Sequence, residues 1–173
     1  MKHIGNFTVT SGKLIVSDPC YDRDVWCMGE LSNVQNGEWE AFVVVSNEGD
    51  WGNRIAELII RHTSRPDIED IDIDRPTSFH VGVDSGQAGF FCDSIYPHGD
   101  CGEYDDLSSF YGRACDKTLN TSEQAGIVDN AGVVSSSGFG DGSYDCYVHH
   151  DSETGKIVAA SIVFISDDED DDA

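Results

Sequence analysis

An Asn-Gly pair at residues 36 and 37 precedes a run of β-branched and aromatic residues, and this feature constrains the fold most. Asn-Gly is the preferred centre of a two-residue type I′ β-hairpin turn. Residues 38–45 read Glu-Trp-Glu-Ala-Phe-Val-Val-Val, so the last four are apolar on both faces of a strand. Because such a strand has to be covered on both faces, we expect it to lie centrally between two packed layers.

Short apolar runs between turn residues recur along the rest of the chain. Strands are predicted near residues 7–9, 14–16, 54–62, 67–74, 78–83, 132–134, 144–149 and 156–165, the last two as a hairpin. One helix is predicted from Asp105 or Asp106 to about Leu119, with an Asp as N-cap and Leu107 and Leu119 on its apolar side. The expected fold is mainly β (β-rich α+β): an antiparallel sandwich or partly open barrel with one packed helix, forming a single domain over residues 1–165.

The charge of the chain is strongly negative, with 33 acidic and 10 basic residues and a formal net charge of −23. A field of this sign repels nucleic acid and anionic membranes, so we expect no direct binding to either, and it favours cationic partners. Solubility, adaptation to high salt and mimicry of nucleic-acid charge stay open as explanations. Residues 166–173 are expected to be a disordered acidic tail.

Six cysteines occur without a C-x-x-C pair, and the N-terminus lacks the apolar region of a secretory signal. Reduced thiols and a cytoplasmic location are therefore expected, and a zinc site is not. Cys115 has Arg113 close in sequence, but no feature brings a histidine to it, which favours a buried structural thiol over a nucleophile.

Enzyme signatures are missing from the sequence. It contains no G-x-S-x-G elbow, P-loop, H-E-x-x-H or EF-hand frame. No catalytic residue and no cofactor is predicted. Residues 84–93 and 141–145 place aspartates on glycine-rich loops, which suits either a divalent-cation site or Asx-type turns, so metal binding stays open.

The densest local signal is the segment Ser-Ser-Ser-Gly-Phe-Gly-Asp-Gly-Ser-Tyr-Asp at residues 135–145. Glycines that tolerate positive φ mark either a sharp corner or a backbone cradle for a ligand. Because an alternating strand follows at once, we interpret the segment as the tight entry to the C-terminal hairpin. Trp26 and Trp51 lie near turns and are candidates for stacking on a ligand or for core positions.

Three segments resemble blocks of an uncharacterised family of bacterial and phage proteins, known as a domain of unknown function. They are residues 12–19 (Gly-Lys-Leu-Ile-Val-Ser-Asp-Pro), 82–93 (Gly-Val-Asp-Ser-Gly-Gln-Ala-Gly-Phe-Phe-Cys-Asp) and 137–144. The resemblance covers most of residues 5–165 and implies a compact β-rich cytosolic protein. It also implies that Asp18, Asp84, Asp93 and Asp141 belong to shared motifs, and it carries no reaction, cofactor or partner.

The predicted site is therefore a binding site on loops. Its predicted residues are Asp18, Asp84, Gln87, Asp93, Asp141 and Tyr144. The leading hypothesis is a non-catalytic cytosolic binding module whose loops around Asp18, Asp84 and Asp141 contact a small polar ligand or a cationic protein surface. The alternatives are an acidic nucleic-acid mimic that inhibits a DNA-binding or defence protein, and an Asp-based, metal-dependent hydrolase. The oligomeric state is not predicted.

Overall fold

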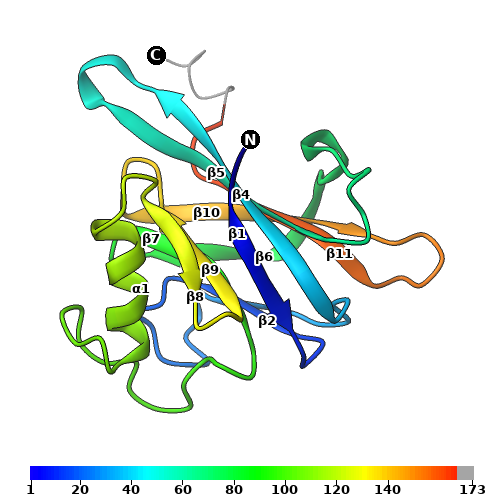
Figure 1. Cartoon of the computed structure of the whole chain (residues 1–173), viewed down its shortest axis with the longest axis horizontal. Helices are drawn as coiled ribbons and strands as arrows, with labels where there is room; N and C mark the ends of the chain where they lie inside the picture. The colour runs from blue at the N-terminus through cyan, green and yellow to red at the C-terminus, as the bar shows by residue number, and fades with distance from the viewer. Residues whose placement is uncertain (167–173) are drawn as a thin grey trace.

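Two antiparallel sheets and one α-helix make up the fold in the computed structural model, which describes residues 1–166 apart from the side chain of Ile71 (Figure 1). The larger sheet has the order β1 (Lys2–Val9), β4 (Gly37–Asn47), β5 (Asn53–His62), β11 (Ile157–Val163), β10 (Gly142–His150) and β6 (Arg75–Val83). The smaller sheet has the order β3 (Gly29–Leu31), β2 (Leu14–Ser17), β7 (Gln87–Cys92), β9 (Gly132–Ser136) and β8 (Ala125–Val128). The sheets do not close into a barrel, which confirms the β-rich sandwich.

The main core lies between the two sheets. The larger sheet contributes side chains such as Phe7, Trp39 and Ile162, and the smaller one contributes Leu14 and Phe90, all buried. Alternate residues of each strand point into this layer, as the pleat requires. Burying each of these side chains contributes roughly 1.5–3 kcal/mol, so this layer supplies most of the driving force for folding.

Two smaller clusters cover the outer faces of the sheets. The helix α1 (Phe110–Leu119) packs Phe110 and Ala114 against the outer face of the smaller sheet. On the larger sheet, Ile68 and Ile73 pack over Phe42. The central position predicted for the strand after residue 37 is confirmed for its middle part, because β4 lies between β1 and β5 and residues 41–43 are buried, whereas Val45 is 48% exposed.

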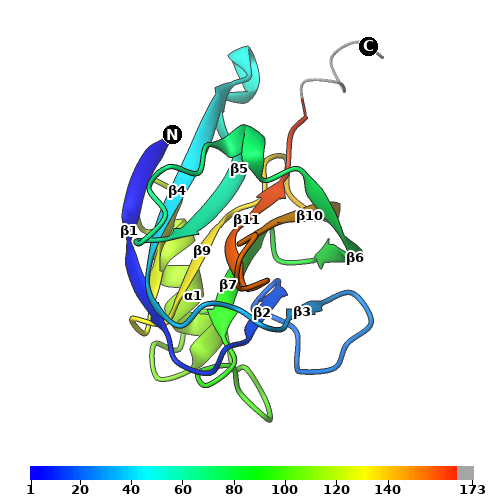
Figure 2. The ribbon, with the colours of Figure 1, turned by 90° about the vertical axis from the view of Figure 1, so that its right-hand side faces the viewer.

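The open sides of the sandwich are closed by glycines that allow close contact between the sheets. On one side, a Cβ at Gly29 of β3 would lie 2.1 Å from the ring of Phe79 of β6. On the other, a Cβ at Gly5 of β1 would lie 2.7 Å from Ile127 of β8. Figure 2 shows the larger sheet from β1 to β6, with β2 and β3 below β6. A side chain at Gly29 would displace Phe79 and open that side.

The prediction of a hairpin at Asn36-Gly37 is wrong. β4 pairs with β1 and β5, whereas β3 pairs with β2 in the other sheet, so no hairpin surrounds this dipeptide. Gly37 has φ +118°, and a Cβ there would lie 2.8 Å from Nε2 of His62. The same imidazole nitrogen lies 2.8 Å from the Asn36 carbonyl oxygen. The glycine is explained by a long-range contact with His62 rather than by a turn.

Residues 67–74 do not form the predicted strand. They contain the short 3₁₀-helix η2 (Asp70–Asp72), with a capping box between Glu69 and Asp72. A second 3₁₀-helix, η1 (Gly49–Trp51), precedes β5. Since Ile68 and Ile73 both turn onto the larger sheet, the segment has to loop back between them, which a strand cannot do.

The helix begins later than predicted. Ser109 is its N-cap, with its hydroxyl accepting a hydrogen bond from Gly112 N at 3.0 Å, in place of Asp105 or Asp106. Leu107 lies before the helix, and both Leu107 and Leu119 are exposed rather than packed on the sheet. The strand at β5 and the C-terminal hairpin of β10 and β11 are confirmed.

All six cysteines are free thiols. No helix within residues 1–166 is long and apolar enough to cross a membrane. The predicted acidic tail falls almost wholly on residues 167–173, which lie outside the described part of the chain.

Candidate functional site

Asp18 is a buried carboxylate that joins two loops. Its side chain is fully buried and lies where β2 ends. Oδ1 accepts hydrogen bonds from Cys20 N at 2.9 Å and Ser85 Oγ at 2.6 Å. Oδ2 accepts from Asp84 N at 2.8 Å and Ser85 N at 2.6 Å. With four donors in place, Asp18 holds the turn between β6 and β7 against the loop that follows β2, and no oxygen of this carboxylate faces solvent.

Gln87 belongs to a buried polar cluster between β7 and the helix. Gln87 is buried, donates to Cys115 Sγ at 3.2 Å and accepts from Thr118 Oγ1 at 2.9 Å. Buried amides need such partners because an unpaired polar group costs stability. Gln87 thus fixes α1 on β7.

Asp93 lies at the opposite end of β7 and is neutralised by Arg23. Nη1 of Arg23 donates to Asp93 Oδ1 at 2.6 Å, and Nη2 donates to the carbonyl oxygens of Asp93 and Tyr96 at 2.7 Å. Nε donates to Pro97 O at 3.1 Å. A guanidinium that is saturated in this way anchors two loops to each other. The structure separates Asp93 from the other predicted aspartates.

The glycine corner is closed by its own hydrogen bonds. Ser137 Oγ donates to Gly140 O at 2.9 Å, and Gly140 N donates to Ser137 O at 3.1 Å. The Tyr144 hydroxyl donates to Gly140 O at 2.6 Å, while its ring packs edge-on against Phe164. Gly138 has φ +65°. These bonds occupy the Gly140 N–H and the carbonyl oxygens of Ser137 and Gly140, which supports the interpretation as a corner.

Asp84 and Asp141 are exposed and stand at the same end of one strand pair. Gly142 pairs with Val83 at the end of the β6–β10 ladder, and the next residues on the two strands are Asp141 and Asp84. Within residues 1–166, neither carboxylate takes part in an ion pair. Like charges at facing strand ends repel each other, so this position favours an external cation.

A cleft of about 400 Å³ opens at this end of the strand pair, where Val83 and Gly142, the sequence neighbours of Asp84 and Asp141, line it. Its lining is Tyr21, Trp26, Cys27, Ser78, Phe79, His80, Gly82, Val83, Gly142 and Ser143. The loop of residues 18–28 forms one wall, because Gly82 N donates to Cys27 O at 2.8 Å. Trp26 is 92% exposed on this loop.

No lysine or arginine lines the cleft. Its one ionisable imidazole, on His80, lies 2.8 Å from Asp145. The walls therefore combine aromatic faces with nearby carboxylates, a combination that suits a cationic group.

The sequence identified only part of this cleft. Trp26 was recognised as a stacking candidate and Asp84 and Asp141 as binding residues, but Tyr21, Phe79 and His80 were not. Phe79 and His80 sit inside a strand pattern that reads equally well as core. The sequence signal available was a tryptophan on the Asp-rich loop of residues 18–28.

Among the described residues, no three His, Cys, Asp or Glu side chains converge so that they could hold a metal ion. The fold and cleft define a β-sandwich with an acidic, aromatic-lined depression at one end. No protein family, curated protein or solved structure matches the chain. The resemblance to the family of unknown function stays a prediction.

Proposed function

We propose that the protein is a non-catalytic cytosolic binding module whose end cleft takes a cationic side chain on the surface of a partner protein. The observation that carries this proposal is that Asp84 and Asp141, at facing strand ends, directly follow and precede Val83 and Gly142, two residues that line a cleft with an exposed Trp26. A guanidinium or ammonium over an indole face gains about 0.5–2 kcal/mol. The two carboxylates add attraction and steering.

Recognition in the cleft takes place through side chains rather than by adding a strand to β6. The free edge of β6 carries Pro76, and the pairing of β6 with β10 is irregular between Pro76 and His80. Cys27 already occupies the N–H of Gly82. Proline, irregular pairing and covering loops are the features by which proteins block strand addition at an edge.

The test is binding of a fluorescein-labelled nona-arginine peptide at 150 mM salt, measured by anisotropy. Trp26→Ala and the double variant Asp84→Asn/Asp141→Asn should each weaken binding at least fivefold. Trp51→Ala removes another exposed tryptophan, and Asp50→Asn/Glu153→Gln makes the same change in net charge elsewhere on the surface. These controls should change affinity less than twofold.

Equal weakening by the test variants and by their controls would contradict the proposal. It would mean that the overall field of the protein attracts the peptide, as the nucleic-acid-mimic hypothesis requires. That hypothesis also predicts that duplex DNA competes for a basic partner protein, with no dependence on Trp26.

A further inference from the structure

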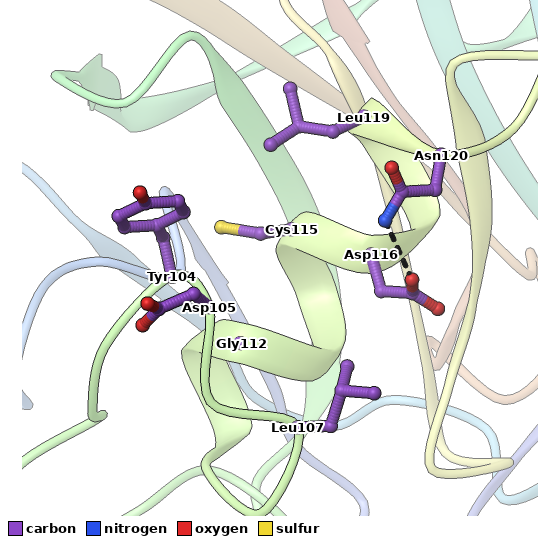
Figure 3. Close-up of a pocket in the computed structure, with 8 residues that line it drawn as sticks. All are labelled: Tyr104, Asp105, Leu107, Gly112, Cys115, Asp116, Leu119 and Asn120. Atoms are coloured by element: carbon purple, nitrogen blue, oxygen red, sulfur yellow. Dashed lines mark hydrogen bonds between the residues drawn. The ribbon is translucent and has the colours of Figure 1, made fainter.

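A second concave surface lies on the helix, away from the end cleft. It encloses about 320 Å³ and is lined by Tyr104, Asp105, Leu107, Gly112, Cys115, Asp116, Leu119 and Asn120 (Figure 3). Figure 3 shows Cys115 pointing from α1 toward the Tyr104 ring, with Leu119 on the same side of the helix. We call this surface the helix pocket.

Three large apolar side chains form the rim of the helix pocket and are left unused by the fold. Tyr104 is 62% exposed, Leu107 61% and Leu119 70%. The helix is held on the sheet by its other face, through Phe110, Ala114 and their neighbours. Single exposed apolar residues are common on protein surfaces, but a group gathered round one depression indicates an interaction site.

The rim is held in place before any partner binds. A Cβ at Gly112 would lie 1.9 Å from the Asp106 carbonyl oxygen, so the preceding loop rests directly on the helix backbone. Ser109 Oγ donates to the carbonyl oxygens of Glu103 and Asp106, and Tyr111 N donates to Cys101 O. Preorganised rims lower the entropy cost of binding.

The charge around the pocket selects the kind of partner. Asp105 and Asp116 line it, and no lysine or arginine does. Arg113 is occupied by Asp129 at 2.8 and 3.0 Å, and the stem of Lys117 lies over Gly126. A second copy of this chain would bring a net charge of −23 to an acidic face, so self-association here is opposed by repulsion.

We propose that the helix pocket is the docking site for a cationic amphipathic helix of a partner protein. An apolar side chain of that helix enters between Tyr104, Leu107 and Leu119, and flanking lysines or arginines face Asp105 and Asp116. Amphipathic helices bind in this way to apolar grooves, with their charged residues at the rim. The inference is independent of the end cleft, because the two surfaces share no lining residue.

The probe is a labelled 14-residue leucine–lysine peptide with helical periodicity, compared with a permuted peptide of the same composition that lacks this periodicity. Anisotropy should show tighter binding of the periodic peptide to the wild-type protein. Leu107→Ser/Leu119→Ser should weaken its binding at least tenfold, and Asp105→Asn/Asp116→Asn about threefold.

Matched control variants distinguish binding in the helix pocket from attraction by the overall negative charge of the protein. Val45→Ser/Trp51→Ser removes two apolar side chains that are 48% and 70% exposed elsewhere, at unchanged net charge, and should change affinity less than twofold. Asp50→Asn/Glu153→Gln is the control for the charge variant. Trp26→Ala should leave this affinity unchanged, so that failure of the end cleft and failure of the helix pocket are distinguishable.

Equal binding of the periodic and permuted peptides, or equal loss in the Leu107/Leu119 variant and its control, would overturn the proposal. A wild-type dimer in light scattering that Leu107→Ser/Leu119→Ser dissociates would also overturn it, because a second copy would then occupy the pocket. If the double variant does not fold, Tyr104→Ser gives the same comparison at the exposed loop.

Discussion

Two aspartates that are linked by a hydrogen bond differ completely in their surroundings. Asp18 is buried and accepts four hydrogen bonds, one of them from the backbone N–H of Asp84. The side chain of Asp84 points into solvent, next to Asp141. Both are aspartates directly after a strand, so the difference arises from the number of donors that the fold brings to each carboxylate. A carboxylate with a full set of donors stabilises the fold, and one without them is available to a partner.

The largest effect on the free energy of unfolding is expected at Asp18. Replacing Asp18 with Ala leaves the N–H groups of Cys20, Asp84 and Ser85 without their acceptor. Each buried, unsatisfied group costs about 1–3 kcal/mol, so we expect the free energy of unfolding to fall by about 3–5 kcal/mol in urea titrations. Asp84→Ala is the matched control, because it keeps the backbone N–H that bonds to Asp18. A loss below 1 kcal/mol for Asp18→Ala would contradict the structural role.

Glu57 provides an intermediate case, a partly buried carboxyl group that forms no ion pair within residues 1–166. Burial, a hydrogen bond with Asp70 and repulsion by that carboxylate raise the pKa of Glu57 to about 8. Among residues 1–166, no N–H or hydroxyl group donates to the buried Oε2 of Glu57. The ordinary pKa of a glutamate side chain is 4.5. Between pH 4.5 and pH 8 the native state therefore holds a proton that the unfolded chain has released. Linkage then requires the free energy of unfolding to fall as pH rises through this window.

We expect Glu57→Gln to remove this fall in the free energy of unfolding with rising pH. Because the carboxyl is partly exposed, solvent screening reduces the effect to about 1–2 kcal/mol. The difference in unfolding free energy between wild type and Glu57→Gln should shift by that amount between pH 4.5 and pH 9, with the variant favoured at high pH. Glu38→Gln, an exposed position on β4, controls for the change in net charge. A difference that does not change with pH would show that Glu57 titrates normally.

Local patterns predicted the elements well where the pattern itself decides the structure. The apolar runs of β5 and of the β10–β11 hairpin follow from side-chain alternation, which is a property of neighbouring residues. Asn36-Gly37 failed because Gly37 serves a contact with His62, which lies on another strand. The helix N-cap failed because several polar residues before Phe110 suit that role, and the chosen one, Ser109, also bonds to Glu103 and Asp106.

The sequence predicts which residues belong to the site, but it does not predict how they are arranged in space. Asp84 and Asp141 were recognised from their glycine-rich surroundings, yet their proximity depends on the register of β6 against β10. That register is set by packing across the whole sheet and has no local signature. The same limit explains why Asp18 and Gln87 looked equivalent to Asp84, since only the folded chain shows that their polar atoms face inward.

The smallest effect on stability is expected for the pair that we assign to binding. Exposed substitutions away from caps and networks usually change the free energy of unfolding by no more than about 0.5 kcal/mol. For Asp84→Asn/Asp141→Asn the sign should be stabilising at low salt, because the variant removes the repulsion between two facing carboxylates. Salt near 1 M shortens the Debye length to about 3 Å, so the gain should vanish there. Urea titrations at both salt concentrations check this, with Asp50→Asn/Glu153→Gln as the charge-matched control. A loss above 1 kcal/mol would make both aspartates structural like Asp18, and the contrast between the buried and exposed carboxylates would disappear.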